Sequence, residues 1–340
     1  MVTTEKLYER VEAAYDIRLQ SHELIKHKPD SSFVAKLVAE SGDAYALKSL
    51  FEPPERQRFI AESERLLAER GVGLAPPVRA KDGRLFFEHE GAPYVLYEWL
   101  PGEGAPLNKP DDLLRIVELS ARFHRASAGM EYPSGVQEYG HLDWREEYAQ
   151  RLRSIEDWLA KEGRTKSGKK GLIAAAIPYF LKTGEMAFRE LKKSAYGAYA
   201  EGSAGARTLV HGDLHNKNVL IHGGSLKLID FEDVRYDAPS KDLIRIHSMY
   251  AKRRAFEART FRLMLQRYLE INPLSQDVRR LVEIDLLFPH VFERTLRKKK
   301  YKKMTEEEVA FYLEHERRRT EYAKKRFFGS DASSGKEGKA

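Results

Sequence analysis

The stretch His211-Gly-Asp213-Leu-His215-Asn-Lys-Asn218 is followed, twelve residues after its last position, by Asp230-Phe-Glu232 at the end of an apolar run. Together the two stretches have the form H-x-D-x-x-x-x-N and D-F-x, with room for a short hairpin between them. Phosphoryl transfer needs one carboxylate to orient the attacking hydroxyl, and an amide oxygen with a second carboxylate to hold Mg²⁺ against nucleotide phosphates. The spacing therefore predicts a kinase-like phosphotransferase that is not of the protein-kinase type.

Each position of these motifs has an expected role. Asp213 would be the base that orients the acceptor hydroxyl, and His211 would brace the catalytic loop. Asn218 and Asp230 would be the Mg²⁺ ligands, because magnesium prefers hard oxygen donors. A hydrophilic turn built from Asp and Asn is the plain alternative, but four matching positions at the right offsets favour catalysis. Zinc held by His211 and His215 is a weaker hypothesis, because the residues between them do not look helical.

Lys48, in the third predicted strand, is expected to contact the α- and β-phosphates of a nucleotide. Its partner would be a carboxylate on the helix that follows. Glu62 and Glu64 both qualify, and because they are two positions apart they lie on different faces of that helix. We choose Glu62.

The loop 26–32 between the first two strands would cover the phosphates, although it contains no glycine. Ser31 and Ser32 would then donate hydrogen bonds to phosphate through their hydroxyl or backbone groups. An ordinary hairpin turn explains this loop equally well.

Length and composition narrow the class of protein. With 340 residues and 42% apolar content, the chain can bury the core of one large or two medium domains. It has no run of eighteen apolar residues and no apolar core at its N-terminus, so we expect neither a membrane-spanning nor a conventionally secreted protein. The absence of cysteine excludes disulfides and thiol nucleophiles, and it fits a reducing cytoplasm.

Positive charge is concentrated near the C-terminus. Of a net charge of +7, residues 291–340 contribute most, with 15 Lys and Arg against 9 Asp and Glu. Solvated helix faces explain most runs of the kind seen at 297–303 and 317–319. The sharper interpretation is a surface for an anionic partner, substrate or phosphate-rich polymer. No zinc-finger, RNP or helix-turn-helix pattern supports nucleic acid, which is therefore not favoured as a partner.

Hydrophobic periodicity divides the chain into a strand-rich first part and a helical remainder. The first part is predicted to contain a helix at 2–15, three strands within 22–51, a helix at 55–70 and strands at 85–88 and 94–97. Later helices are expected at 111–126, 143–160, 172–198 with an interruption or kink at Pro178, 240–271, 275–297 and beyond 304, where Thr305 and Glu308 form a capping box.

This order predicts an α+β, two-lobed protein-kinase-like fold. A small antiparallel β lobe over 1–97 would bind nucleotide, and a larger, mainly α lobe over 98–328 would carry catalysis and substrate binding. The Ser-, Gly- and Lys-rich tail 329–340 is expected to be disordered.

The segment after Asp230 is short for a peptide substrate. Protein kinases place a long activation segment ending in A-P-E there as a docking platform, whereas here about a dozen residues precede the next helix. We therefore expect a hydroxyl of a small molecule or saccharide as the acceptor. The insertion 130–200, with Tyr139, Trp144 and Trp158, would shape its pocket, although such aromatics belong more often to the core.

The catalytic residues resemble the aminoglycoside phosphotransferase and choline kinase superfamily, whose motif is H-G-D-x-x-x-x-N followed by I-D-[FW]-[ED]. Further stretches resemble the CotS-type spore-coat proteins of endospore-forming bacteria, in that family's order, over nearly the whole chain. These stretches are Tyr94-Val-Leu-Tyr-Glu-Trp99, Ala121-Arg-Phe-His-Arg-Ala-Ser127, Lys241-Asp-Leu243 and Phe288-Pro-His-Val-Phe292.

The resemblance implies ATP and Mg²⁺ as cofactors, with the motif residues and Lys48 in the roles given above. It also implies that the backbone of the hinge residues Glu98, Trp99 and Leu100 contacts adenine. The spore-coat resemblance implies a place in the cytoplasm of the sporulating mother cell or on the coat, with spore-coat proteins as further partners.

Three rival interpretations remain open. A non-catalytic scaffold of the spore coat would keep the fold, although intact Asp213, Asn218 and Asp230 argue against it. An atypical protein kinase would phosphorylate a coat protein. A polyanion-binding protein would act through the basic C-terminal helices and would show a steep dependence of binding on salt.

Overall fold

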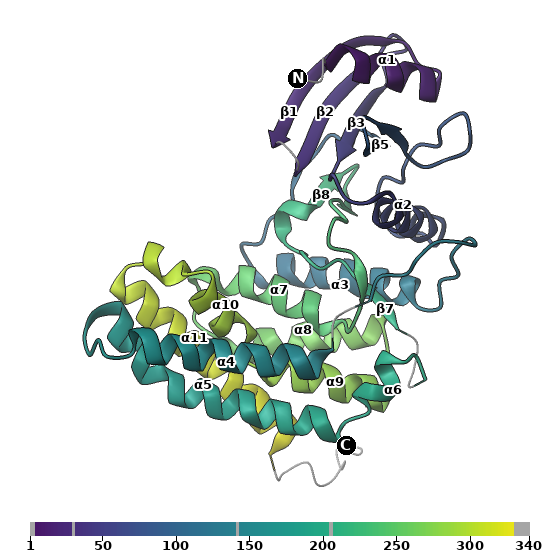
Figure 1. Cartoon of the computed structure of the whole chain (residues 1–340). Helices are drawn as coiled ribbons and strands as arrows, with labels where there is room; N and C mark the ends of the chain where they lie inside the picture. The colour runs from purple at the N-terminus through teal and green to yellow at the C-terminus, as the bar shows by residue number, and fades with distance from the viewer. Residues whose placement is uncertain (1–3, 29–30, 141–142, 204–206, 330–340) are drawn as a thin grey trace. The chain divides into compact units, whose positions relative to one another are not determined.

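The computed structural model describes residues 4–28, 31–140, 143–203 and 207–329. It divides into two compact units (Figure 1). The first consists of Met1–Pro106, Glu118–Gly140 and Thr208–Tyr236, and the second of Leu107–Val117, His141–Arg207 and Asp237–Ala340. The hairpin at 208–232 carries the motifs predicted to be catalytic, and we call it the catalytic hairpin. It belongs to the same compact unit as the N-terminal sheet, whereas the predicted boundary at residue 97 separates the two.

The first unit is built on a five-stranded antiparallel sheet in the order β1-β2-β3-β5-β4. Its strands are β1 (Leu19–Lys28), β2 (Ser32–Ala39), β3 (Ala44–Ser49), β4 (Phe87–His89) and β5 (Ala92–Glu98). Burial alternates along β2, as expected for a strand with one covered face. The buried positions of the sheet pack with Leu7, Tyr8 and Val11 of α1 (Thr4–Tyr15). The predicted strand meander and first helix are thus confirmed.

Helix α2 (Pro54–Glu69) lies between β3 and β4 in sequence and packs on β5. Pro53 and Pro54 explain where it begins, because proline is tolerated at the first helical position but not inside a helix. Its buried residues include Phe59, Ile60 and Leu67. This helix brings carboxylates to the sheet next to Lys48.

The catalytic hairpin consists of short strands. Strand β8 (Val219–His222) pairs with β9 (Ser225–Leu228) and with β6 (Glu103–Gly104), while β7 (Thr208–Val210) pairs with β10 (Arg235–Asp237). A single turn of 3₁₀ helix, η1 (Asn216–Asn218), precedes β8. Helix α3 (Pro110–Ser127) contributes residues to both units.

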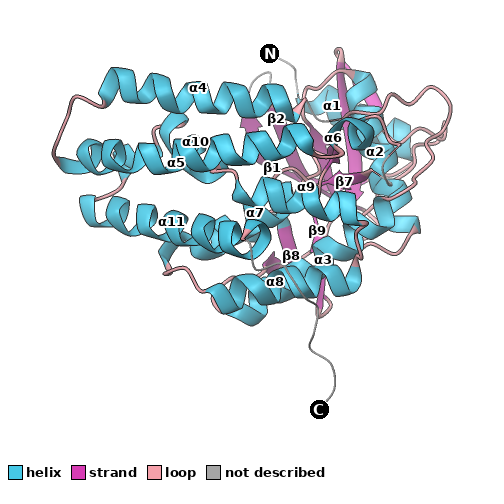
Figure 2. Ribbon diagram, turned by 90° about the horizontal axis from the view of Figure 1, so that it is seen from below, coloured by secondary structure: helices cyan, strands magenta, loops and turns pink. Residues whose placement is uncertain are grey.

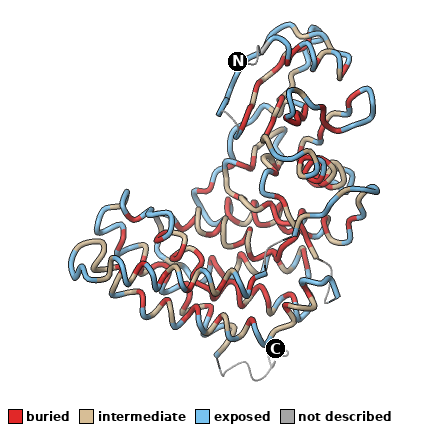
Figure 3. The backbone as a smooth tube through the Cα atoms, in the orientation of Figure 1, coloured by how far each residue is buried: buried red, intermediate tan, exposed pale blue. Residues whose placement is uncertain are grey.

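The second unit is helical. Helix α5 (Gly168–Lys193) packs against α4 (Trp144–Glu162), α9 (Gln276–Leu287) and α11 (Glu306–Phe328), and Figure 2 shows α4, α5 and α11 as long, roughly parallel rods. The remaining helices are α6 (Tyr196–Ala200), α7 (Ser240–Tyr250), α8 (Ala258–Ile271) and α10 (His290–Arg297), with 3₁₀ turns η2 (Ala251–Arg253) and η3 (Lys300–Lys303). The buried stretches of these helices are red in Figure 3.

Two details of the helix predictions can be compared with the structure. Helix α5 continues through Pro178 and ends at Lys193, so the break in the segment 172–198 comes at Ser194 and not at the proline. The capping box before α11 is confirmed, because the Thr305 side chain accepts from the Glu308 backbone N–H and the Glu308 side chain accepts from that of Thr305. The tail from residue 330 lies outside the described residues.

A buried polar centre holds four helices of the second unit together. The carboxylate of Asp285 is fully buried and accepts hydrogen bonds from Tyr148 (2.7 Å) and Ser240 (2.6 Å). It also bonds Lys241 (3.1 Å) and His290 Nε2 (2.6 Å). A buried carboxylate is stable only when it is paired in this way, so these contacts fix α4, α7, α9 and α10 at one point.

Among the helices of the described residues, none combines the length with the apolar character that a membrane span requires.

Candidate active site

The catalytic loop begins with a glycine that no other residue can replace without strain. Gly212 has φ +83°, and a Cβ atom there would lie 2.5 Å from the carbonyl oxygen of Asp233 and 2.7 Å from the guanidinium of Arg235. The left-handed conformation and the close approach both favour glycine. This glycine turns the chain after β7 and leads directly into Asp213.

Hydrogen bonds join the two halves of the catalytic motif. The side-chain amide of Asn218 donates to the carbonyl of Asp213 (3.2 Å), and the N–H of Ile229 donates to the carbonyl of Asn218 (3.1 Å). His211 is fully buried, and its Nε2 donates to the carbonyl of Ile229 (2.9 Å). The loop of residues 211–218 is therefore tied to the residue that precedes Asp230. Because the Asn218 nitrogen is used within the loop, its oxygen is the atom available to a cation.

Asp230 has an unusual backbone conformation, with φ +64°. Such a conformation is uncommon for a residue with a side chain, and it persists where the surrounding structure holds it. The Asp230 carboxylate accepts a hydrogen bond from the ammonium of Lys48 on β3. Burial alone would raise the pKa of Asp230, but the charge and hydrogen bond of Lys48 hold it below its ordinary value. The carboxylate is thus kept in the charged form that a metal ion requires.

Of the two candidate partners of Lys48, Glu64 lies in its surroundings and Glu62 does not. The Glu62 carboxylate pairs with Arg65 on the same helix (2.8 Å), whereas Glu64 is 4% exposed and lines a small cavity with Lys48. Positions two apart on a helix differ by about 200° in direction, so only one of them can face the sheet. The choice of Glu62 is therefore corrected to Glu64.

Glu64 is held by Tyr97, which the sequence analysis did not single out. The Tyr97 hydroxyl donates to the Glu64 carboxylate (2.8 Å). Burial raises the pKa of Glu64 to about 8, even though this bond and the charge of Lys48 act in the opposite direction. The cavity between them measures about 10 Å³ and is also lined by Gln57 and Glu232. That volume is about the size of one water molecule.

Two more charged residues belong to the surroundings of Asp230. Glu232 follows it in the D-F-E motif, and burial raises the pKa of the Glu232 carboxyl. Lys26 on β1 adds to the positive charge that lowers the pKa of Asp230. The sequence signal for Glu232 was the last position of the motif itself. For Lys26 the only sequence signal was its place at the start of the loop that was expected to cover the phosphates.

The two serines of that loop have different surroundings. Ser31 is exposed in the turn, and its N–H donates to the carbonyl of Lys28 (3.1 Å). Ser32 is 4% exposed on β2, so Ser31 and not Ser32 presents its side chain to solvent. Pro29 and Asp30, at the tip of the loop, lie outside the described residues.

The hinge segment follows β5 directly. The N–H of Trp99 donates to the carbonyl of Ala44 on β3 (2.9 Å), and Lys36 lies over the Trp99 ring, 5.0 Å from its centroid. The Trp99 N–H is therefore used within the sheet, and the expected contact of the hinge backbone with adenine stays a prediction. Glu98 is exposed and Leu100 partly so.

The residues at the site fit magnesium better than a metal held by protein alone. Within the described ranges there is no group of three His, Cys, Asp or Glu side chains placed to hold an ion. Asn218 and Asp230 instead offer one amide oxygen and one carboxylate, which suits a cation whose remaining ligands are phosphate oxygens and water. His211 Nε2 is bonded to a carbonyl, which removes that nitrogen from metal binding.

Residues 25–280 match the phosphotransferase enzyme family known as APH. This chain belongs to that family. The APH match begins within β1, covers the other strands of the N-terminal sheet and the catalytic hairpin, and agrees with the motif from which the fold was predicted.

Two relatives and a solved structure are similar to this chain over most of its length. The chain is 25% identical to spore coat protein S of Bacillus subtilis over 72% of its own length and 71% of that protein. It is 29% identical to the endospore coat-associated protein YutH of the same species, over 72% and 70%. An aminoglycoside phosphotransferase of Alicyclobacillus acidocaldarius shares the fold, with TM-score 0.70, 18% identity and coverage of 94% and 93%. The predicted α+β two-lobed kinase-like fold is confirmed.

Proposed function

We propose that this APH-family protein transfers the γ-phosphoryl group of ATP, with Mg²⁺, to a hydroxyl of a small molecule or saccharide. The observation that carries the proposal is the bonded arrangement of Asp213, Asn218 and Asp230, with Lys48 on Asp230. These residues supply a base, two oxygen ligands and a phosphate-binding cation within one compact unit.

The roles follow from the chemistry of each group. Asp213 would accept the proton of the acceptor hydroxyl, and His215 Nε2 lies 3.5 Å from its carboxylate. Lys48 would leave Asp230 and place its charge on the nucleotide phosphates, near the neutral, buried Glu64. Asn218 and Asp230 would hold Mg²⁺, which when bound neutralises the negative charge of the phosphates. His211 would hold the loop in place through Ile229.

The relatives point to a setting. Proteins named spore coat protein S and endospore coat-associated protein match most of this chain. We therefore propose that the activity serves spore coat formation, in the cytoplasm of the mother cell or on the coat. A homoserine kinase of Neisseria meningitidis matches 52% of the chain at 26% identity. A kinase that acts on a small hydroxylated molecule is consistent with the proposed acceptor class.

A coat scaffold without catalysis is the second candidate, because the two spore relatives are named for the coat and not for a reaction. It requires no metal-dependent nucleotide binding. An intact set of three catalytic side chains favours the enzyme.

The deciding experiment compares Mg²⁺-dependent ATP binding and turnover of wild type with Asp230→Ala, using a panel of hydroxylated acceptors. The enzyme predicts binding that requires Mg²⁺, a loss of turnover in Asp230→Ala and transfer to at least one acceptor. Asp233→Asn is the matched control, since Asp233 is exposed and three residues away. Equal ATP binding with and without Mg²⁺ in both proteins, with no acceptor phosphorylated, would favour the scaffold.

A further inference from the structure

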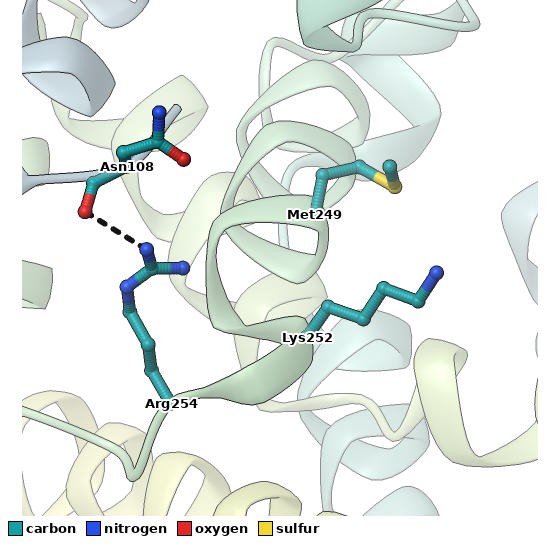
Figure 4. A pocket seen from close by; sticks show the side chains of 4 residues that line it. All are labelled: Asn108, Met249, Lys252 and Arg254. Carbon is teal, nitrogen blue, oxygen red and sulfur yellow. Dashed lines mark hydrogen bonds between the residues drawn. The ribbon is translucent and has the colours of Figure 1, made fainter. Parts of the chain in front are cut away.

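The helical unit contains a cavity that the proposed phosphoryl transfer does not use. It measures about 410 Å³ and is lined by Asn108, Met249, Lys252 and Arg254, which Figure 4 shows around the end of α7. Pockets for small molecules in proteins commonly measure roughly 300–1,000 Å³. The cavity is therefore of the right size for a small ligand and too small for a folded part of another protein.

One of the two cations at this cavity is fixed in place. Arg254 donates from Nη1 to the carbonyl of Tyr250 (2.7 Å) and from Nη2 to the carbonyl of Asn108 (2.8 Å, dashed in Figure 4). Its guanidinium also lies over the Tyr250 ring, 4.6 Å from the centroid. A guanidinium held by neutral carbonyls keeps its full positive charge, and its fixed position lowers the entropy cost of binding an anion.

The second cation, Lys252, belongs to a larger group that we call the basic cluster: Arg245, Lys252, Arg294, Lys298 and Lys300. Loss of hydration lowers the pKa of Lys300, and the charges of the other four members lower it further. The members come from two stretches that are far apart in sequence. Arg245 in α7 and Lys252 in η2 form one, and Arg294, Lys298 and Lys300, from the end of α10 into η3, form the other. The fold therefore brings the predicted basic run 297–303 to cations that the sequence does not place near it.

Ordinary helix termination does not account for this concentration of charge. Cations at a helix C-terminus are favourable because they face the negative end of the helix dipole, and one or two would serve each helix here. The charges of the other four members act on Lys300, and an anion bound beside Lys252 would offset part of this repulsion. Met249 adds an apolar surface to the cavity wall, which suits the carbon skeleton of an organic anion.

We propose that this cavity with the basic cluster is a binding site for a small organic anion that carries phosphate or carboxylate groups. The site is independent of the proposed phosphoryl transfer. It gives a function to part of the C-terminal positive charge, for which the sequence alone left open a solvated helix face or a surface for an anionic partner, substrate or phosphate-rich polymer.

The test is isothermal titration at fixed ionic strength with glucose 6-phosphate and citrate as anionic probes and glucose as the neutral one. Wild type should bind at least one anionic probe and bind glucose much more weakly. The double variant Lys252→Gln/Lys300→Gln should lose at least about tenfold in affinity. Lys302→Gln/Lys303→Gln is the matched control, because it removes two exposed charges from the same turn, and it should change affinity by less than about twofold.

Lys48→Met is a second control and should leave probe binding unchanged, since Lys48 belongs to the candidate active site. Loss of binding in Lys48→Met would overturn the proposal, because the anion would then occupy the nucleotide site. Anionic probes that bind no better than glucose would overturn it too. An equal loss of affinity in the two double variants would also overturn the proposal. The same holds if a DNA duplex binds more tightly than the small anions, with a steep dependence on salt, and both double variants weaken it equally. Either result indicates a general polyanion surface. All substituted lysines are exposed or half-buried, and melting temperatures close to that of wild type check the fold.

Discussion

The ammonium of Lys48 donates a hydrogen bond to the carboxylate of Asp230, although the two residues are 182 positions apart in sequence. Lys48 comes from the central part of the N-terminal sheet and Asp230 from the end of the catalytic hairpin. In this bond the opposite charges of the two groups offset each other, and the carboxylate stays ionised. Each residue is thus held ready for a more highly charged partner, phosphate for the lysine and Mg²⁺ for the aspartate.

Lys48→Met and Asp230→Asn should each weaken MgATP binding by about tenfold or more. Because the two residues are in contact, the double variant should lose less free energy of binding than the sum of the single losses. Titration of MgATP into the four proteins of the cycle measures this. The exposed pair Lys81–Asp16, 2.9 Å apart, is the control, because the same set of variants at this pair should leave the affinity for MgATP unchanged. If the losses in binding free energy at Lys48 and Asp230 were strictly additive, the two residues would not act together in MgATP binding.

Asp213→Asn should lower the rate of phosphate transfer by about 10²- to 10⁴-fold, because it removes the proposed base. Nucleotide affinity should remain within about threefold, since Asp213 is not among the proposed metal ligands. Single-turnover kinetics and equilibrium binding separate the two effects. A variant that kept its transfer rate, or that lost both properties together, would assign Asp213 a different role.

Glu64→Gln should change how stability depends on pH. The pKa of Glu64 in the folded protein is raised to about 8, against about 4.3 in an unfolded chain. The folded state therefore binds this proton more tightly, and its contribution to stability is present below pH 4 and is lost as the pH rises toward 8. The wild-type free energy of unfolding should fall, relative to the variant, by up to about 1.4 kcal/mol per pH unit over this range.

Urea unfolding of wild type and Glu64→Gln between pH 5 and 8 measures the effect. Glu55→Gln, an exposed carboxylate on the same helix, should follow the wild-type profile within about 0.5 kcal/mol. A difference between Glu64→Gln and wild type that did not vary with pH would show that Glu64 is ionised in the folded protein.

Gly212→Ala should destabilise the protein by at least about 3 kcal/mol, from the left-handed backbone and from the clash with Asp233 and Arg235. Gly224→Ala is the matched control, because Gly224 has φ +76° and a Cβ there meets nothing within 4 Å. The control should lose only about 1–2 kcal/mol. Similar losses in chemical denaturation of the two variants would mean that the loop can move away from the added methyl group.

Asp285→Asn should cost up to about 3–5 kcal/mol, because the buried Lys241 loses the nearer of its two carboxylate partners and keeps only Glu147, at 3.5 Å. Burial would raise the pKa of Asp285, but Lys241 and His290 hold it well below its ordinary value. Its contribution to stability is therefore present above pH 4 and is lost as the pH falls further. Urea unfolding at pH 7 measures the loss, with the exposed Asp157→Asn as the control. A loss under about 1 kcal/mol would mean that the centre tolerates a neutral amide.

Sequence reasoning located the catalytic motif, the order of strands and helices, and the cap of the last helix. These features depend on residues close together in the chain, such as Thr305 with Glu308 or the alternation of buried positions along β2. It chose the wrong glutamate on α2 because Glu62 and Glu64 are equally good helix residues. It also expected an interruption or kink at Pro178, whereas α5 continues through the proline to Lys193. A helix supported by neighbouring helices can tolerate one lost backbone hydrogen bond.

What the chain determined by local chemistry is therefore the set of available groups: the H-G-D motif, the lysine of the third strand and the C-terminal excess of cations. Tertiary structure decided which of these groups meet. It turned Glu64, and not Glu62, toward Lys48, and it brought Lys300 close to Lys252. The physical reason is that helix rotation and the pairing of distant segments depend on how buried side chains fit together across elements, and no short stretch of sequence contains that information.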